Sequence, residues 1–313
     1  MSSPIVAVVG PTATGKSALA HRLAREIDGE IVNADALQVY RGFDVGTAKP
    51  TPAEREEVPY HLIDILDPGE RYSAGEFSRR ARERIAEIEA RGRSAIVVGG
   101  SGLYLRALWS GLAPLPPPDP VVRRELEERL ARDGIAALAG ELRRADPTTA
   151  GRLGARDAQR ILRALEVRIS TGRPLSNWIA RTPFGTTPVA MRKFGLTLPR
   201  AVLYDRIEKR AREMMKLGWM EEIEALLVSG VDRDAPAFQA IGYAELLAAI
   251  DGRDSREGAL EKLIRATRRF AKRQETWFRR EDDIHWWDAR VVAAEFDAIV
   301  KAAVSDGGRG TDE

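Results

Sequence analysis

Short apolar runs alternate with amphipathic segments through the first third of the chain. Runs such as 5–9 and 94–99 are almost wholly apolar, which is typical of strands buried on both faces of a parallel sheet. The pattern predicts strands at 4–9, 30–33, 60–66 and 94–99, and helices at 18–27, 74–91 and 102–110. Ser73 and Ser101 precede two of these helices and suit their N-caps. Strands that alternate with helices predict an α/β fold with a parallel sheet between layers of helices.

The character of the chain changes at the proline-rich stretch 114–120. Its three consecutive prolines can continue neither a helix nor a central strand. Asp119 and Pro120 then suit the N-cap and first residue of a new helix. Residues 121–171 are predicted to be helical, with breaks at Gly134, at Asp146-Pro147 and at Gly154. We therefore expect an inserted all-helical lobe.

After this lobe, a turn-rich segment at 181–188 leads to a predicted strand at 192–198, and helices follow to about residue 280. Residues 306–313 are polar and glycine-containing, which predicts a disordered tail. The expected domains are an α/β core with C-terminal helices, made of 1–113 and 190–305, and a helical insertion at 114–189.

Composition limits the kinds of chemistry that this chain can perform. The 313 residues have a net charge of only +2, so any basic surface must be local. The absence of cysteine excludes disulfides, thiolate metal sites and a cysteine nucleophile, and the three histidines are scattered. No signal peptide or membrane-length apolar run is evident, so we expect a cytoplasmic protein. No long apolar helix demands a partner, which favours a monomer.

The most informative motif joins the first predicted strand to the first predicted helix. It is a G-x-x-x-x-G-K-S phosphate loop formed by Gly10, Pro11, Thr12, Ala13, Thr14, Gly15, Lys16 and Ser17. Such a loop points backbone N–H groups at phosphate oxygens, and the helix N-terminus adds partial positive charge. Lys16 is expected to reach the outer phosphate, and the Ser17 hydroxyl to bind Mg²⁺. The α/β core is therefore predicted to be P-loop NTPase-like, a class that includes nucleotide-binding and ATP-binding proteins.

Asp35 is the first candidate for catalysis, because it comes just after the second predicted strand. Ligands bind at the carboxyl ends of strands in open α/β sheets, so Asp35 should face the same crevice as the phosphate loop. A carboxylate there can act as a general base or hold Mg²⁺, whereas the alternative is a helix N-cap. Gln38 carries both a donor and an acceptor, as the edge of adenine does.

Two groups of basic residues are candidates for binding nucleic acid. Arg160 and Arg163 share a helix face and, with Gln159, could grip phosphate or bases; a solvated surface is the alternative. Later, helical spacing aligns Arg265, Arg268, Arg269, Lys272, Thr276 and Arg279 in one basic stripe. Such a stripe suits a phosphate backbone, and the interleaved Phe270, Trp277 and Phe278 could stack on bases or belong to the core. Arg210 is either a second phosphate-binding cation or a member of a surface ion pair.

These motifs, in this order, resemble the tRNA dimethylallyltransferase family, also called the tRNA isopentenylpyrophosphate transferases. The similarity covers roughly residues 5–287, and its motifs beyond the phosphate loop are more specific than the loop itself. They are Gln38–Gly42 with Asp44–Pro50, Val98–Tyr104, Arg163–Val167, Gln239–Tyr243, and Ala271–Gln274 followed by Thr276-Trp277.

The resemblance implies a prenyltransferase that moves a dimethylallyl group from dimethylallyl diphosphate to the exocyclic amine of the tRNA adenosine just 3′ of the anticodon. By resemblance, Asp35 is the general base, Lys16 and Arg210 neutralise the departing diphosphate, Ser101 lies at the reaction channel, and Mg²⁺ is the cofactor. Gln38 would help to fix the flipped-out base, and the helical lobe would clasp the anticodon stem. The expected tRNA-binding residues are Asp35, Ala36, Leu37, Gln38, Ser101, Arg123, Gln159, Arg160, Ile161, Leu162, Arg163, Gln239, Ala240, Ile241, Gly242, Tyr243, Ala244, Lys272, Arg273, Gln274, Glu275, Thr276, Trp277, Phe278 and Arg279.

This chain departs from the commonest family pattern at two positions. Ala36 stands where a serine usually follows the aspartate, and Ser101 stands where threonine is usual. Serine keeps the hydroxyl of threonine, so the second change should matter little. Ala36 lacks a hydroxyl beside the base, which removes any role for that side chain in tuning Asp35.

Three other functions share part of this pattern. A P-loop kinase acting on a small metabolite or nucleoside explains the phosphate loop, Lys16 and Asp35, but not the basic late helix or the helical insertion. An enzyme that prenylates free adenine nucleotides would need no tRNA surface. In a non-catalytic, nucleotide-dependent RNA-binding switch, the position of Asp35 would be incidental.

Overall fold

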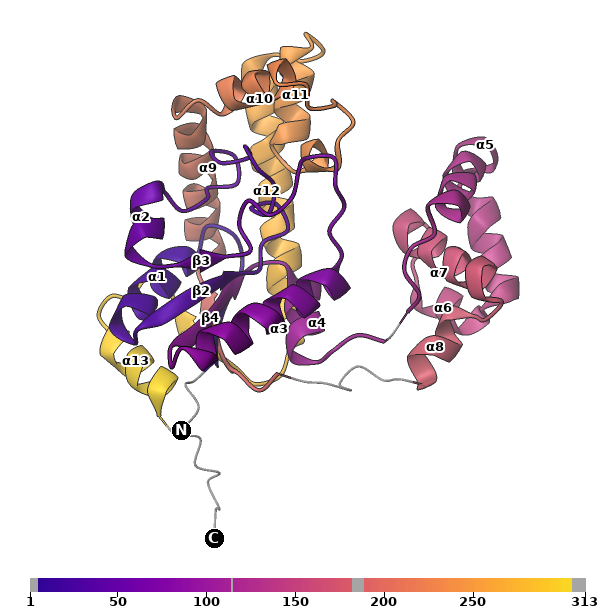
Figure 1. Ribbon diagram of the computed structural model, residues 1–313. Helices are drawn as coiled ribbons and strands as arrows, with labels where there is room; N and C mark the ends of the chain where they lie inside the picture. Colours follow the sequence, from indigo (N-terminus) through magenta and orange to yellow (C-terminus); the bar gives the residue numbers. More distant parts are fainter. Residues whose placement is uncertain (1–4, 114, 182–188, 306–313) are drawn as a thin grey trace. The chain divides into compact units, whose positions relative to one another are not determined.

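A computed structural model describes residues 5–113, 115–181 and 189–305 (Figure 1). These residues form two compact units, one made of the chain up to residue 108 and from residue 189, and the other of residues 109–188. The tail predicted at 306–313 and most of the turn-rich return predicted at 181–188 lie outside the described residues. No helix in the described part of the chain is long and apolar enough to cross a membrane.

The first unit is built on one six-stranded sheet in which every paired strand is parallel to its neighbour. Its strands are β1 (Ile5–Val9), β2 (Gly29–Asn33), β3 (Tyr60–His61), β4 (Ser94–Gly99), β5 (Arg192–Thr197) and β6 (Ile284–Asp288), in the order β3-β2-β4-β1-β5-β6. The central strands β1, β2 and β4 are almost completely buried, as their apolar runs predicted. The α/β fold with a parallel sheet is confirmed.

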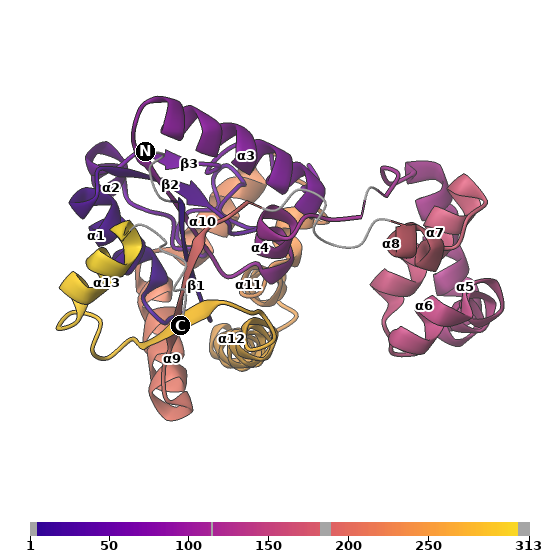
Figure 2. The same ribbon diagram turned by 90° about the horizontal axis from the view of Figure 1, so that it is seen from below.

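Helices cover both faces of the sheet (Figure 2). On one face, α1 (Lys16–Glu26) and α13 (Phe296–Val304) pack against Val6, Val8 and their neighbours in β4 and β5. α3 (Ala74–Ala90) and α4 (Gly102–Trp109) lie on the other face. Ser73 caps α3 as expected, because its hydroxyl accepts the Glu76 N–H at 3.1 Å.

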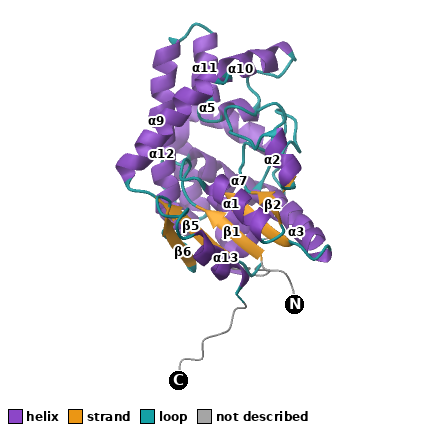
Figure 3. Cartoon of the chain, turned by 90° about the vertical axis from the view of Figure 1, so that its left-hand side faces the viewer, coloured by secondary structure: helices purple, strands orange, loops and turns teal. Residues whose placement is uncertain are grey.

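A helical layer extends beyond one end of the strands (Figure 3). It consists of α9 (Arg200–Lys216), α10 (Trp219–Val228), the 3₁₀ turn η1 (Pro236–Gln239), α11 (Tyr243–Ile250) and α12 (Arg256–Phe278). Its apolar core also takes in Val39, Tyr40 and Phe43 from the loop after β2. The loop that carries Asp35 and Gln38 is thus anchored by helices that come more than 150 residues later in the sequence.

The second unit is a small helical bundle formed by α5 (Pro120–Ala145), α6 (Pro147–Arg152), α7 (Ala158–Thr171) and α8 (Leu175–Arg181). Asp119, Asp146 and Asp157 cap the first three of these helices through their carboxylates. Gly134 kinks α5 with a φ of 76°, at the predicted break. The core of this unit contains Leu126, Leu138 and Leu142 of α5 and Ile161, Leu162 and Leu165 of α7.

Two expectations about secondary structure were wrong or incomplete. The strand predicted at 60–66 ends at His61, because Leu62 and Asp64 have φ values of 62° and 55° and only Leu66 makes an isolated bridge, to Tyr40. The strand β6 and the helices α2 (Pro52–Glu57), α8 and α13 were not expected. β6 is an edge strand with the exposed residues His285 and Trp286, so it lacks the apolar signal of the inner strands.

Candidate active site

The candidate active site lies where β1, β4 and β2, adjacent in the sheet, end at their carboxyl edge. The phosphate loop 10–15 follows β1, Gly100 and Ser101 follow β4, and Asp35 comes two residues after β2. Because parallel strands end at the same edge, the sheet brings these segments together. The sequence correctly predicted this convergence for Asp35 and the phosphate loop.

The phosphate loop is folded around one of its own carbonyl groups, that of Pro11. Lys16 Nζ donates to the Pro11 carbonyl oxygen at 2.7 Å, and Thr14 Oγ1 donates to the same oxygen at 2.9 Å. Ser17, one residue later in the first turn of α1, is exposed. The loop therefore holds Lys16 over its own turn, where an anion could replace the carbonyl as its partner.

Lys16, Arg210 and Asp35 form one electrostatic cluster. Burial, reinforced by the nearby Arg210 guanidinium, lowers the pKa of Lys16 to about 7, and the Asp35 carboxylate opposes that shift. Burial also lowers the pKa of Arg210 on α9, again with Asp35 acting in the opposite direction. Two partly desolvated cations beside one carboxylate make a site with an excess of positive charge. An anionic ligand would relieve the repulsion between Lys16 and Arg210.

Asp35 and Ser101 are held by backbone groups of the loop after β2. The Leu37 N–H donates to Asp35 Oδ1 at 2.8 Å, and the Ala36 N–H donates to Ser101 Oγ at 3.1 Å. Residues 36–50 contain no helix, so the alternative that Asp35 is a helix N-cap is wrong. The Ser101 hydroxyl also faces this loop, and its oxygen lies next to Ala36, the residue that follows Asp35.

The side-chain amide of Gln38 has a fixed orientation. Its Nε2 donates to the carbonyl oxygens of Thr47 and Ala48, at 3.0 and 3.1 Å. Since both donors of the amide point to backbone carbonyls, its Oε1 is oriented to accept from a ligand. In its predicted role toward a base, Gln38 would therefore act through its Oε1 as an acceptor, because its Nε2 donors are already engaged.

Glu222 of α10 holds the loop that fixes Gln38. Its carboxylate accepts the N–H groups of Asp44, Val45 and Gly46 at 2.7, 2.6 and 3.3 Å, and the Tyr243 hydroxyl at 2.6 Å. Burial and Glu222 together raise the pKa of Tyr243. Nothing in the spacing of Glu222 indicates this role, because the three backbone N–H groups that it accepts lie about 180 residues earlier in the sequence.

Replacement of Gly46 by alanine is expected to lower the free energy of unfolding by about 1–3 kcal/mol. A Cβ atom at this position would lie 2.0 Å from Nε1 of the buried Trp219 and 2.6 Å from the Tyr243 ring. Chemical denaturation measures the effect. Gly69→Ala is the matched control, because a Cβ there meets nothing within 4 Å. Equal stability of the two variants would contradict the expected overpacking.

The predicted nucleic-acid helix, α12, has an exposed face and a buried one. Lys272, Arg273, Thr276 and Arg279 are exposed, whereas Gln274 and Phe278 are buried. Trp277 packs over Gly102, where a Cβ would lie 2.4 Å from its ring, and the Arg106 guanidinium is 4.6 Å from the ring centroid. Trp277 and Phe278 therefore belong to the packing of the molecule, and we leave them out of the proposed tRNA surface.

The other predicted tRNA-binding residues divide in the same way. Gln239 and Ala244 are exposed, whereas Ala240, Gly242 and Tyr243 are buried around Trp219. In the helical unit, Gln159 and Arg160 are exposed, whereas Ile161 and Leu162 are core residues.

Arg163 and Arg123 are engaged inside the helical unit. Arg163 donates to Glu166 at 3.0 Å and to the Pro116 carbonyl, and Arg123 pairs with Glu127 at 2.8 Å. Glu166 is itself buried and also accepts the Asp119 N–H at 2.8 Å. Arg163 and Arg123 thus help to hold the bundle together.

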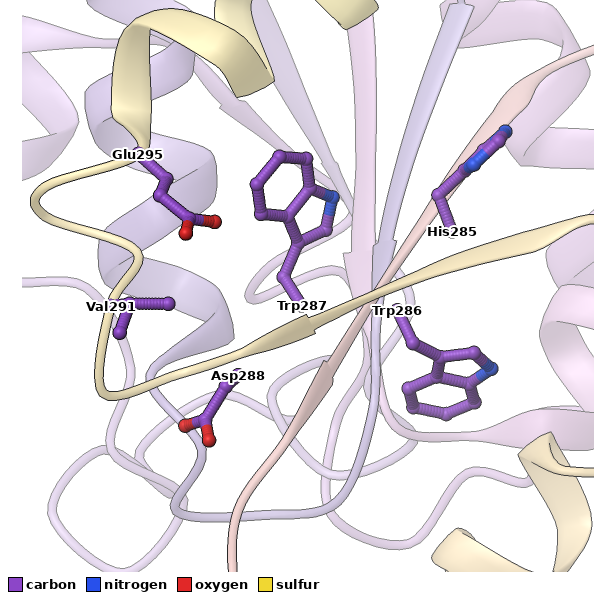
Figure 4. Close-up of a pocket in the computed structure, with 6 residues that line it drawn as sticks. All are labelled: His285, Trp286, Trp287, Asp288, Val291 and Glu295. Carbon is purple, nitrogen blue, oxygen red and sulfur yellow. The ribbon is translucent and has the colours of Figure 1, made fainter.

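A separate hollow of about 400 Å³ lies beside the edge strand β6 (Figure 4). It is lined by His285, Trp286, Trp287, Asp288, Val291 and Glu295. Trp286 and Trp287 project to opposite sides of the strand, and Asp288 pairs with Arg290 at 2.6 Å. Within the described residues, no group of three or more histidine, aspartate or glutamate side chains could hold a metal ion. This hollow is not the candidate site, because it lacks the phosphate loop and the cations around Lys16.

Comparison with known proteins finds a family model and relatives that match most of the chain. The family model described as IPP transferase matches residues 38–281. The tRNA dimethylallyltransferase of Geobacter metallireducens is 45% identical over 300 residues, which are 96% of each chain. The Kocuria rhizophila protein of the same name is 48% identical over 286 residues, 91% of this chain and 90% of the relative.

Two solved structures are similar over almost the whole chain. The tRNA isopentenylpyrophosphate transferase from Bacillus halodurans has a TM-score of 0.69 at 37% identity, with 96% of this chain and 97% of that chain covered. A eukaryotic dimethylallyltransferase acting on tRNA has a TM-score of 0.78 at 26% identity, with 97% of this chain and 82% of that chain covered.

Proposed function

Because this chain belongs to the tRNA dimethylallyltransferase family, we propose that it transfers a dimethylallyl group from dimethylallyl diphosphate to a tRNA adenosine, releasing diphosphate. The acceptor is the exocyclic amine of the adenosine just 3′ of the anticodon. The observation that carries this proposal is the cluster of Lys16, Arg210 and Asp35 beside the phosphate loop. It places anion-stabilising cations and a candidate base at one edge of the sheet.

The cations act on the leaving group. An allylic C–O bond breaks readily because positive charge spreads over the allyl group, so the main demand on the enzyme is to stabilise the departing diphosphate. Lys16, Arg210 and the N–H groups of the phosphate loop supply that stabilisation in a partly desolvated site. The electron pair of the broken bond leaves with the diphosphate, and the carbon is left open to attack.

Asp35 acts on the nucleophile. The lone pair of an adenine amine is delocalised into the ring, so the amine attacks better when a carboxylate removes its proton. As the new C–N bond forms, the proton passes to an Asp35 carboxylate oxygen. The base must leave its stack to reach this edge of the sheet. The Gln38 Oε1 acceptor and the neighbouring Ser101 hydroxyl would then help to hold it.

The residues at the site fit Mg²⁺ delivered together with a diphosphate. Mg²⁺ usually keeps several waters and takes only one or two protein ligands beside the substrate phosphates. The exposed Ser17 hydroxyl at the start of α1 would be one such ligand, and the Asp35 carboxylate would take part through water. When bound, the ion would add positive charge to the departing diphosphate.

We propose that residues of each unit contact tRNA. In the first unit they are the half-buried Gln38 and the exposed Gln239, Ala244, Lys272, Arg273, Thr276 and Arg279, and in the helical unit they are the exposed Gln159 and Arg160. Lys272 and Arg273 present positive charge on the same helix whose buried face reaches the phosphate loop. We propose that the helical unit clasps the anticodon stem, that the protein acts as a monomer, and that it works in the cytoplasm with its tRNA substrate.

The test is direct transfer. The protein is mixed with Mg²⁺, dimethylallyl diphosphate and an unmodified tRNA that has adenosine 3′ of the anticodon. We expect a prenyl-sized mass gain on that nucleoside, and no gain on a matched tRNA with guanosine there. If the protein instead transfers phosphate from ATP to a small acceptor and tRNA gains no mass, the proposal is wrong and the P-loop kinase is the better description.

Binding of the donor in the absence of tRNA is expected to weaken as pH rises from 7.5 to 9. The pKa of Lys16 is about 7 in the free protein, so Lys16 is largely deprotonated across this range. Dimethylallyl diphosphate keeps its full charge there, because a terminal phosphate loses its last proton near pH 6. Binding must then take up a proton, and the dissociation constant should rise by up to about tenfold per pH unit.

Calorimetry in buffers of different ionisation heat measures this proton uptake. Lys16→Met is the matched control and should show no uptake. A wild-type dissociation constant that stays flat across this pH range would contradict the depressed pKa.

A further inference from the structure

We infer that Gln274 is a positioning residue, which ties the phosphate loop to the turn after β4. The resemblance to the family had placed this side chain among those that touch tRNA. In the structure it is only 7% exposed, although its neighbours Lys272 and Arg273 are exposed. Because buried polar groups are normally hydrogen-bonded, the amide of this buried glutamine needs hydrogen-bond partners inside the protein.

Both ends of the Gln274 amide have such partners. Oε1 accepts the Thr12 N–H of the phosphate loop at 2.9 Å, and Nε2 donates to the Gly100 carbonyl at 2.9 Å. These groups lie 262 and 174 residues away in sequence. One buried side chain therefore spans the ends of β1 and β4.

The Gln274 amide packs directly against Gly100 and leaves no room for a side chain there. A Cβ atom at position 100 would lie 2.3 Å from Gln274 Nε2 and 3.5 Å from the Gly10 carbonyl oxygen. Any side chain here would push the amide away from the turn or the turn away from the phosphate loop. Glycine at position 100 is thus explained by the close approach of Gln274.

This contact extends to the candidate base. Gly100 is followed by Ser101, whose hydroxyl accepts the N–H of Ala36, the residue next to Asp35. Gln274 thereby fixes the phosphate loop with respect to the turn that meets the Asp35 loop. The inference rests on the proposed function only for the identity of the ligand, because the loop it positions binds diphosphate in that proposal.

The test separates binding of diphosphate from binding of tRNA. Gln274→Met removes both hydrogen bonds at nearly constant volume, and Lys272→Met removes an exposed charge from the same helix. The probes are inorganic diphosphate with Mg²⁺, measured by calorimetry, and unmodified tRNA, measured by filter binding.

For Gln274→Met we expect the dissociation constant of diphosphate to rise about tenfold or more, and that of tRNA to stay within about twofold. For Lys272→Met we expect the reverse pattern. Hydrogen exchange at the Thr12 amide should also become faster in Gln274→Met, because that N–H loses its acceptor.

Two results would overturn the inference. One is a loss of tRNA affinity in Gln274→Met with diphosphate affinity unchanged, and the other is no change in either. If Gln274→Met does not fold, Gln274→Glu keeps the shape and the acceptor for Thr12 but places a carboxylate oxygen against the Gly100 carbonyl. Wild-type diphosphate affinity in that variant would equally refute the role. If the wild-type protein binds diphosphate but modifies no tRNA, the proposed function fails while the result on Gln274 stands.

Discussion

Asp35→Asn is expected to lower the rate of dimethylallyl transfer by about 10²–10⁴-fold, while tRNA binding stays close to that of the wild-type protein. Asparagine keeps the size of the side chain and an oxygen that can accept the Leu37 N–H, which the aspartate accepts at 2.8 Å. It cannot take the proton of the adenine amine. Single-turnover transfer to tRNA, with product measured by nucleoside mass, reports the chemical step.

A second effect of this substitution must be separated from the first. The Asp35 carboxylate raises the pKa of Lys16, so its removal should move the titration of Lys16 below pH 7 and weaken donor binding at neutral pH. Measurement at pH 6 with saturating donor favours the protonated form of Lys16, and so separates the loss of the base from the weaker donor binding. Near-normal transfer by Asp35→Asn under these conditions would show that another group accepts the proton.

The parts of the site that follow from local sequence were predicted correctly. The order of strand, phosphate loop and helix from residue 5 to 26 is confirmed, because each step depends on neighbouring residues. Asp35 also lies where expected, since the end of a buried strand fixes its edge of the sheet. The positions of the breaks at Gly134 and Asp146 follow from the backbone preferences of glycine and of Asx-Pro pairs.

The parts that depend on distant partners could not be predicted. A helical stripe shows that Gln274 and Trp277 lie near basic residues, but it does not show which side of α12 faces the protein. Gln274 turned out to meet Thr12 and Gly100, and Trp277 to cover Gly102. Glu222 is a similar case, because an acidic residue in the first turn of a helix is ordinary in any sequence.

These distant contacts explain how a large helical layer can serve a small site. The Asp44–Gly46 segment is held by Glu222, and the phosphate loop is held by Gln274. Both side chains come from helices that lie between β5 and β6 in sequence. The sheet brings the reacting groups to one edge, and the later helices fix the loops that carry them.

Lys16→Met is expected to lower kcat/KM for the donor by about 10²–10³-fold, through a direct loss of transition-state charge stabilisation. Lys16 is the cation of the phosphate loop itself, whereas Arg210 comes from α9. In the free protein Lys16 Nζ has only the Pro11 carbonyl as a hydrogen-bond partner among the described residues. Lys16 Nζ is therefore available to bind the negative charge that develops on the diphosphate.

Lys16→Arg serves as the informative comparison. Arginine keeps the charge, but its planar guanidinium has a different reach and does not lose its proton near neutral pH. We expect this variant to recover only part of the rate and to lose the proton uptake that accompanies donor binding in the wild-type protein. Full activity of Lys16→Met at pH 6, where the wild-type lysine is charged, would show that Arg210 and the loop N–H groups suffice for the leaving group.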